Sequence, residues 1–214
     1  MWSYYGSKSK LLKYYPEPKF DRIVEPFGGT AKYSLKYFER DITIYELFGK
    51  VFEIWQYLQQ ASKKDILNLP DIGYKEKIPI SLSNPERWLI GFCVARGAPR
   101  PATMGHKFNS WEKDKVRIAN DLYKIKHWKI LKSDGLNHPN KKSTWFVDPP
   151  YEKMGYKYNF RKVDYLNLST WCRERNGQVI VCENADAKWL PFTPIKTFRG
   201  VIKTNVEAIW IKDE

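Results

Sequence analysis

Cysteine is scarce in this sequence, which holds three cysteines among 214 residues. Cys93, Cys172 and Cys182 form no CxxC pair, so the sequence favours neither a disulfide framework nor a zinc site. The three histidines share no metal-like spacing, and we predict no metal site. A chain without disulfides is typical of a reducing compartment, so the cytoplasm is the expected location.

Long apolar runs are also missing. No segment approaches the roughly 18 apolar residues that a membrane-spanning helix needs, and the segment from Met1 to Tyr15 lacks the apolar core of a signal peptide. The composition is nevertheless 43% hydrophobic and 16% aromatic, which is too rich for a disordered basic tail. The length fits one domain that carries a sizeable insert.

Acidic residues are too few to balance the basic ones. The chain has 37 Lys and Arg against 24 Asp and Glu, which gives a net charge of +13. Between Arg100 and Trp145, eleven basic residues face four acidic ones, so this segment carries more than half of the excess. Such a charge predicts a polyanionic partner, and a nucleic acid before a membrane surface.

Hydrophobic patterning predicts an α/β fold with a parallel sheet, because strand patterns alternate with helical ones. A closing antiparallel hairpin is predicted at the end of the chain, with its turn at Thr204-Asn205. The expected strands are 20–25, 41–46, 128–132, 143–147 and 178–182, the hairpin strands are 195–203 and 206–212, and the expected helices are 30–38, 48–60 and 164–175.

The middle of the chain interrupts this alternation. Asn84-Pro85 is expected to start one helix and Ser110 to cap another that runs to about His127, with a loop rich in Gly and Pro from 96 to 109. We therefore predict a catalytic domain made of residues 1–67 and 128–214, and an insert over 68–127.

The string Asp148-Pro149-Pro150-Tyr151 follows the strand 143–147 directly. Two prolines cannot continue a strand, so the chain must leave the sheet in a rigid extended turn. This turn presents a carboxylate, the Pro149 carbonyl and an aromatic ring at the carboxyl end of a strand, where open α/β sheets bind ligands. Such a trio can accept two hydrogen bonds from an NH2 group while a flat ring stacks on Tyr151. A proline-rich surface turn without a ligand is the alternative interpretation.

A second motif, Glu25-Pro26-Phe27-Gly28-Gly29, joins the first predicted strand to a helix that Thr30 is expected to cap. Two glycines allow a ligand to approach the backbone closely at a helix N-terminus. The motif is not the GxGxxG of dinucleotide-binding proteins. Glu46 ends the next strand, where an acid accepts hydrogen bonds from a ribose diol.

Taken in order, these motifs resemble those of S-adenosylmethionine-dependent DNA adenine-N6 methyltransferases of the DPPY type. Tyr4-Tyr5-Gly6-Ser7-Lys8 looks like the family's opening Y-x-G-x-K motif, and the segment from Glu25 to Gly29 looks like its E-P-F-x-G motif. Ser133-Asp134 matches the acidic position ahead of the DPPY strand. The resemblance implies a Rossmann-like sheet with an antiparallel C-terminal edge hairpin and a small, mainly helical recognition insert. It also implies a bacterial or phage-infected cell.

The resemblance further implies roles for the matched residues. Glu46 would accept hydrogen bonds from the cofactor's ribose, Asp134 from its adenine amino group, and Tyr4 and Lys8 would hold its methionine part. The residues assigned to the cofactor are Tyr4, Lys8, Glu25, Pro26, Phe27, Gly28, Gly29, Glu46, Asp134 and Asp148. The residues assigned to catalysis are Asp148, Pro149, Pro150 and Tyr151.

The implied reaction transfers a methyl group to the N6 amino group of a flipped adenine and leaves S-adenosylhomocysteine. Asp148 and the Pro149 carbonyl would hold the amino group, and Tyr151 would stack on the base. DNA, most simply a duplex, is the expected partner. The candidate nucleic-acid contacts in and beside the insert are Arg96, Arg100, Lys107, Lys113 and Lys115.

Two positions differ from the family pattern. Glu46-Leu47-Phe48 stands where an Asp-x-Asn is common, and Gly135 stands where an aromatic residue often follows the acid. Two alternatives therefore stay open. One is an enzyme that methylates RNA adenine or the N4 amino group of cytosine. The other is a catalytically silent, basic DNA-binding protein that keeps the methyltransferase fold.

Overall fold

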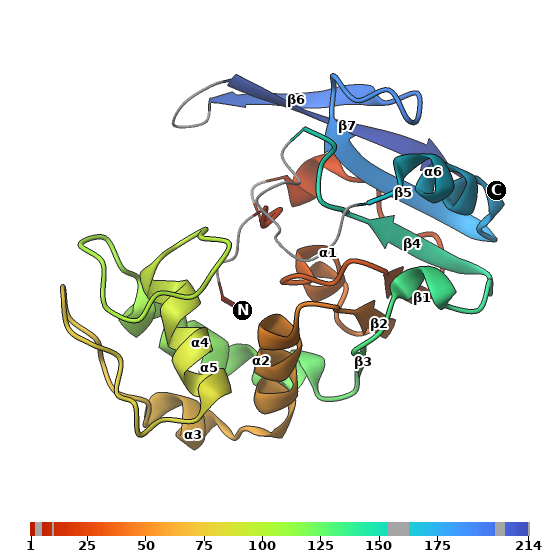
Figure 1. The fold of residues 1–214 in the computed structure, drawn as a ribbon. Coiled ribbons are helices and arrows are strands. Elements are labelled where there is room, and N and C mark those ends of the chain that lie inside the picture. The colour runs from red at the N-terminus through yellow and green to blue at the C-terminus, as the bar shows by residue number, and fades with distance from the viewer. Residues whose placement is uncertain (3–5, 10, 154–162, 200–203, 214) are drawn as a thin grey trace.

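In the computed structural model, which describes residues 1–2, 6–9, 11–153, 163–199 and 204–213, runs rich in β-branched and aromatic residues build one seven-stranded sheet. Its strand order is β3-β2-β1-β4-β5-β7-β6 (Figure 1). The strands are β1 (Arg22–Glu25), β2 (Asp41–Tyr45), β3 (Lys129–Leu131), β4 (Ser143–Val147), β5 (Gly177–Asn184), β6 (Thr193–Arg199) and β7 (Thr204–Lys212).

The first five strands are parallel, and β7 pairs antiparallel with both β5 and β6. The predicted Rossmann-like α/β fold with an antiparallel C-terminal hairpin is therefore confirmed. The predicted turn at Thr204-Asn205 is wrong, because both residues lie within β7 and pair with Arg199 and Phe198 of β6. Backbone pairing with β6 thus decides their conformation over their preference for turns.

Successive side chains of a strand point to opposite faces of the sheet, so the strands contribute to two separate hydrophobic cores. One core packs against α1 (Lys32–Lys36) and α2 (Gly49–Gln60), and the other packs against α6 (Tyr165–Glu174). Sheet residues of the first core are Ile23, Ile42, Ile44, Phe146, Ile180, Cys182 and Ile209; those of the second are Val24, Tyr45, Trp145, Val147, Val179 and Val181.

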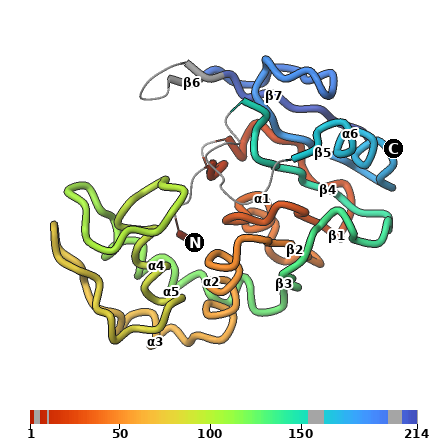
Figure 2. The backbone as a smooth tube through the Cα atoms, viewed as in Figure 1, coloured from red at the N-terminus to blue at the C-terminus, as the bar shows by residue number. Residues whose placement is uncertain are grey.

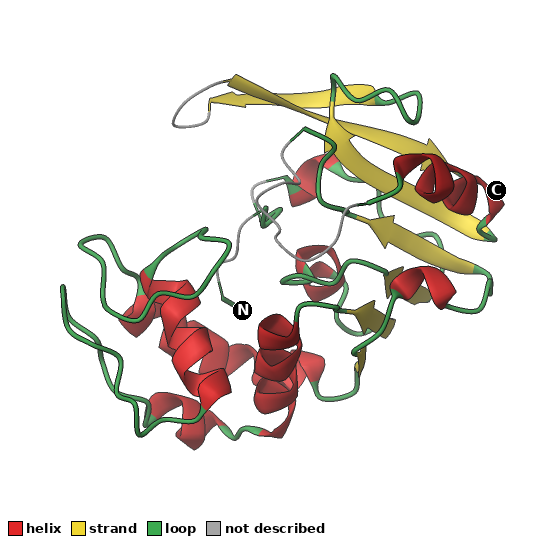
Figure 3. Ribbon diagram, viewed as in Figure 1, coloured by secondary structure: helices red, strands yellow, loops and turns green. Residues whose placement is uncertain are grey.

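A group of helices lies between α2 and β3 in the sequence and beside the sheet in space (Figure 3). It contains α3 (Lys63–Leu67), α4 (Asn84–Val94) and α5 (Trp111–Asp121), which continues into the 3-10 helix η2 (Leu122–Ile125). α4 packs against α2 and α5, and α3 packs against α5. The elements between α2 and β3 are all helices, while the predicted insert and its boundaries at residues 68 and 127 stay a prediction.

Helix starts in this group follow local capping chemistry. α4 begins one residue earlier than expected, because Ser83 is its N-cap and forms a capping box with Glu86. Ser110 stands at the N-cap position of α5, as predicted, but its hydroxyl makes no capping bond and instead donates to the Asp114 carboxylate at 2.6 Å. α3, which we did not predict, is a five-residue helix with its own capping box between Ser62 and Asp65.

The start of the chain lies between the sheet and the helical group (Figure 2). The Met1 ammonium is 3.7 Å from an Asp121 carboxylate oxygen on α5, and the Trp2 ring lies 4.7 Å from Trp55 on α2, centroid to centroid. Within the described residues, no helix has the length and apolar character that crossing a membrane requires.

The order of the strands reverses at β1 and β4. The chain winds outward from β1 through β2 to β3 on one side, and from β4 to β5 on the other. In open α/β sheets, ligands bind at such a switch point, beyond the carboxyl ends of the strands. Glu25 ends β1 and Asp148 directly follows β4, so both predicted motifs lie at this crevice.

Candidate active site

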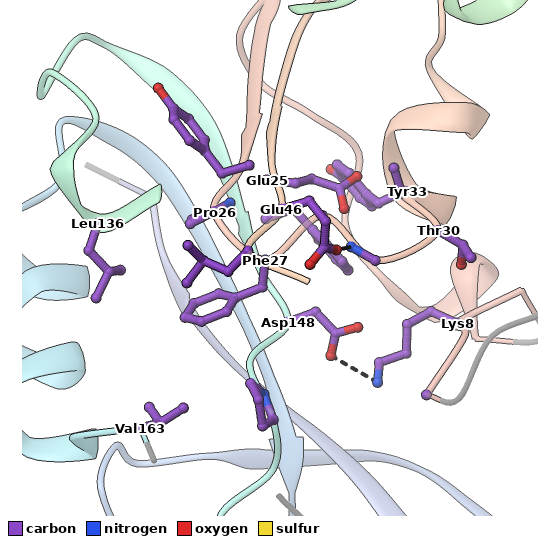
Figure 4. Close-up of a pocket in the computed structure, with 18 of the residues that line it drawn as sticks. Lys8, Glu25, Pro26, Phe27, Thr30, Tyr33, Glu46, Leu136, Asp148 and Val163 are labelled. Carbon is purple, nitrogen blue, oxygen red and sulfur yellow. Dashed lines mark hydrogen bonds and ion pairs between the residues drawn. The ribbon is translucent and has the colours of Figure 1, made fainter. Parts of the chain in front are cut away.

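A pocket opens at the carboxyl ends of β1, β2 and β4 (Figure 4). Phe27, Leu136 and Val163 gather at one end, Asp148 and Lys8 lie at the other, and Glu46 lies between them. Five carboxylic side chains line it, those of Glu25, Glu46, Asp134, Asp148 and Asp164. The other ionisable side chains in the lining are those of Lys8, Lys32, Tyr33 and Tyr45.

The glycine turn after β1 lies against the end of β2. The Gly28 amide donates to the Tyr45 carbonyl at 2.7 Å, and a Cβ on Gly28 would come within 2.9 Å of the same oxygen. Ala31, with a φ of 43°, is the N-cap of α1, so the prediction that Thr30 caps this helix is wrong. The left-handed backbone at Ala31 delays the helix until Lys32.

Glu46 joins the glycine turn to the start of α2. Its two carboxylate oxygens accept hydrogen bonds from the Gly29 amide at 2.9 Å and from the Phe48 amide at 2.7 Å. Burial raises the pKa of Glu46 to about 7, although these backbone bonds act in the opposite direction. A carboxylate offers about four lone-pair positions, so Glu46 retains capacity to accept from a ligand diol.

Glu25 is almost fully buried at the end of β1. Its Oε1 accepts a hydrogen bond from the Ser34 amide at 2.8 Å, which ties β1 to α1. Burial raises the pKa of Glu25 to about 8, and the charge of Asp148 raises it further while the bonds to Ser34 lower it. The pocket therefore holds several carboxylates whose charge is costly unless a cation or a hydrogen-bond donor binds beside them.

The end of the pocket near Asp134 explains one difference from the family pattern. Asp134 accepts a hydrogen bond from the Leu136 amide at 3.1 Å and starts the 3-10 helix η3 (Gly135–Asn137). A Cβ on Gly135 would lie 2.4 Å from the Cα of Pro26, so no side chain fits there without displacing the backbone. The apolar lining is supplied instead by Leu136 together with Phe27 and Val163.

Asp148 forms an ion pair with Lys8 at the other end of the pocket. The Lys8 Nζ lies 2.9 Å from Asp148 Oδ1 and 4.3 Å from the centroid of the Tyr151 ring. Burial raises the pKa of Asp148 to about 6, although Lys8 lowers it. Burial also lowers the pKa of Lys8, but the Asp148 and Glu207 carboxylates outweigh this effect and raise it overall.

Three hydrogen bonds anchor the Asp-Pro-Pro-Tyr turn. They run from the Tyr165 hydroxyl to the Pro150 carbonyl at 2.6 Å, from the Tyr151 hydroxyl to Glu207 at 2.6 Å, and from the Glu152 amide to Glu183 at 2.9 Å. A turn held at three successive residues keeps its carboxylate and ring in one arrangement, which is the property that a site for orienting a substrate needs.

Glu207 was not among the residues predicted from the sequence. It lies on β7, is 2% exposed, and its Oε1 accepts hydrogen bonds from Tyr15 at 2.7 Å and from Tyr151 at 2.6 Å. The sequence carries a weak signal for it, because Glu207 shares the strand face of Ile209, which is buried in the core. An acid at a core-facing position of a strand needs a buried partner.

The predicted site residues fall into three groups. Those of the two central motifs, together with Lys8, Glu46 and Asp134, line the pocket, except Pro149 and Tyr151, which are not among its lining residues. Tyr4 lies outside the described residues. The proposed nucleic-acid contacts do not line the pocket; of these, Arg96, Arg100, Lys107 and Lys113 are exposed.

Lys115 does not fit the role that we predicted for it. Its ammonium bonds the Asp71 carboxylate at 2.6 Å and the Leu69 carbonyl at 2.9 Å, and the residue is only 8% exposed. The ammonium is already bonded within the helical group, so the prediction that Lys115 contacts nucleic acid is corrected: it links α5 to the chain that follows α3.

Comparisons with known proteins do not assign this chain to a family. No protein-family model and no curated protein sequence matches the chain. Similar solved structures include a conserved hypothetical protein of Streptococcus pyogenes (11% identity, 88% of this chain and 84% of that chain, TM-score 0.38). Another is described as "Putative methyltransferase yhhF from Escherichia coli" (7% identity, 97% and 81%, TM-score 0.40). A third is described as a "putative methylase" from Haemophilus influenzae (12% identity, 96% and 85%, TM-score 0.39). Scores at this level carry no argument, so the fold assignment rests on the strand order.

Proposed function

We propose that the protein transfers a methyl group from S-adenosylmethionine to the exocyclic N6 amino group of adenine in DNA. One observation carries the proposal: the Asp148 carboxylate lines the same pocket as Glu46, and the Tyr151 ring lies beside the Lys8 ammonium that pairs with Asp148. An acceptor for an amino group and an acceptor for a ribose diol therefore belong to a single crevice at the switch point of the sheet.

The charge of the pocket favours a cationic cofactor. Five carboxylates and two lysines line it, in a protein whose net charge is +13. Lys32 donates to the Met1 and Trp2 carbonyls and Lys8 pairs with Asp148, so both ammonium groups already have partners. A sulfonium is stabilised beside such carboxylates, whereas the phosphates of a dinucleotide are repelled.

The glycine turn supports the same choice. The Gly28 amide donates to Tyr45, the Gly29 amide to Glu46 and the Ala31 amide to the Gly28 carbonyl. Backbone amides that are engaged in this way are not available to cradle a pyrophosphate. The turn instead presents Glu46, which suits a ribose with two free hydroxyls.

The lining residues divide the pocket into parts that match the cofactor. Phe27, Leu136 and Val163 would hold its adenine, with Asp134 beside them. Glu46 would accept from the ribose hydroxyls, and the carboxylate of Asp148 would lie toward the sulfonium. When bound, the cofactor would supply an electrophilic methyl group: a nitrogen would take it as the sulfur–methyl bond breaks, S-adenosylhomocysteine would leave, and the nitrogen would release one proton.

The residues of this chain would orient the nucleophile. The lone pair of an adenine amino nitrogen is delocalised into the ring, so the nitrogen is a poor nucleophile. Hydrogen bonds from its two N–H groups to Asp148 and the Pro149 carbonyl would favour a pyramidal nitrogen, and stacking on Tyr151 would hold the ring. Removing a target base from a duplex costs roughly a few kcal/mol. The exposed basic residues would offset that cost by binding flanking phosphates.

The proposal is tested by incubating the protein with radiolabelled S-adenosylmethionine and unmethylated duplex DNA, single-stranded DNA or RNA. We expect label in duplex DNA, and we expect Asp148→Ala to lose it while still binding the cofactor. Label in RNA alone would move the assignment to an RNA methyltransferase. Retained DNA binding without cofactor binding or transfer would show a catalytically silent DNA-binding protein.

A further inference from the structure

Lys8, Asp148 and Glu207 form a group of three charges beside Tyr151, in which Lys8 and Glu207 are buried and the Asp148 side chain is 22% exposed. The Lys8 Nζ lies 2.9 Å from Asp148 Oδ1 and 4.0 Å from Glu207 Oε1. The side chains of Lys8 and Glu207 are 9% and 2% exposed. One ammonium is therefore shared unequally between two carboxylates, and Asp148 is the nearer.

In this structure the Lys8 ammonium occupies the place that the proposed function gives to the target amino group. It donates to Asp148 and lies 4.3 Å from the centroid of the Tyr151 ring. A base that stacks on Tyr151 and donates to Asp148 must displace this ammonium. A buried ammonium that leaves its carboxylate is strongly destabilised unless a second acceptor receives it.

We propose that Glu207 is a positioning residue that receives the Lys8 ammonium when a target amino group binds Asp148. The proposal rests on the proposed function of the Asp148 site. A shift of about 1 Å would bring the Lys8 Nζ from its present position within hydrogen-bond distance of Glu207 Oε1. Hydrogen bonds from Tyr15 and Tyr151 fix that oxygen, so the acceptor is already in place.

The transfer keeps a positive charge beside the active carboxylate. After the shift, Lys8 still lies near Asp148 and favours its ionised form. The target amino group can then donate to the Asp148 carboxylate, which is still charged and is no longer bonded to Lys8. A simpler reading gives Glu207 only the task of holding the two tyrosine rings, and the two readings predict different behaviour of variants.

The test is steady-state methyl transfer to duplex DNA, together with calorimetric binding of S-adenosylmethionine, for wild type, Glu207→Gln, Lys8→Met and the double variant. Glutamine keeps an oxygen for both tyrosines but offers no charge to Lys8. We expect Glu207→Gln to raise KM for DNA roughly 10- to 100-fold, the value of a hydrogen bond to a charged group, with cofactor affinity and kcat nearly unchanged. In the Lys8→Met background the same substitution should have little effect, because no ammonium has to move.

Tyr15→Phe serves as the matched control, since it removes one hydrogen bond to Glu207 and leaves the charge. Because the Tyr151 hydroxyl still holds the Glu207 oxygen, Tyr15→Phe should raise KM for DNA much less than Glu207→Gln does, and this comparison also decides the matter if Lys8→Met does not fold. An unchanged KM in Glu207→Gln overturns the proposal, as does an equal loss with and without Lys8, or equal losses in Glu207→Gln and Tyr15→Phe. Absence of transfer by the wild type would instead overturn the proposed function itself.

Discussion

If Glu46 binds the ribose of the proposed cofactor, its buried carboxyl group should make this binding depend on pH. Burial raises the pKa of Glu46 to about 7, while hydrogen bonds from ribose hydroxyls are stronger to the ionised form. With that pKa, about one protein in 11 has Glu46 ionised at pH 6 and about ten in 11 at pH 8. The affinity for a ligand that contacts Glu46 through its ribose should therefore rise about tenfold between these two pH values.

Calorimetry with S-adenosylhomocysteine is the appropriate assay. This ligand has the ribose but no sulfonium, so its binding is less coupled to the ionisation of Asp148. Glu46→Gln should weaken binding at pH 8 roughly 10- to 100-fold, the value of hydrogen bonds to a charged acceptor, and should flatten the pH dependence. Thermal unfolding of both proteins controls for a loss of the turn that Glu46 holds. Equal affinity of the wild type at pH 6 and pH 8, or an unchanged pH slope in Glu46→Gln, would refute the reasoning.

Three further predictions concern other parts of the molecule. Gly135→Ala places a methyl group 2.4 Å from the Cα of Pro26, so it should lower the free energy of unfolding by roughly 1–3 kcal/mol and weaken cofactor binding. Gly49→Ala is its control, because its nearest neighbour would lie at 3.7 Å; equal thermal stability of the two variants would contradict the packing. Asp148→Ala should lower transfer at least about 100-fold with cofactor affinity largely intact, and global unfolding would show instead that Asp148 is structural. Replacing Arg96, Arg100 and Lys107 by alanine should reduce the salt slope of DNA binding by up to about 3, and an unchanged slope would remove these residues from the interface.

The sheet and the central motifs were predictable because their signals are local. β2 and β4 are short runs of β-branched and apolar residues. An acidic residue directly follows each strand, Glu46 after β2 and Asp148 after β4, and its chemistry can be recognised from the sequence alone. Since the carboxyl ends of parallel strands share one edge, local reading was enough to place these two acids together.

The remainder depends on contacts between distant segments. Glu207 reaches Tyr151 and Lys8 only because β7 pairs antiparallel with β5, and no local pattern fixes that register. A lysine in a basic segment is expected at the surface, yet Lys115 is buried and forms an ion pair with Asp71. Gly135 departs from the family pattern because Pro26, over 100 residues away in sequence, leaves it no room.

The central claim is that Asp148 presents an adenine amino group to S-adenosylmethionine. Its most direct test is mass spectrometry of nucleosides from unmethylated duplex DNA that has been incubated with the protein and deuteromethyl-labelled cofactor. The account predicts labelled N6-methyldeoxyadenosine with the wild type and none with Asp148→Ala. Labelled N4-methyldeoxycytidine in its place, or equal labelling by the two proteins, would contradict it.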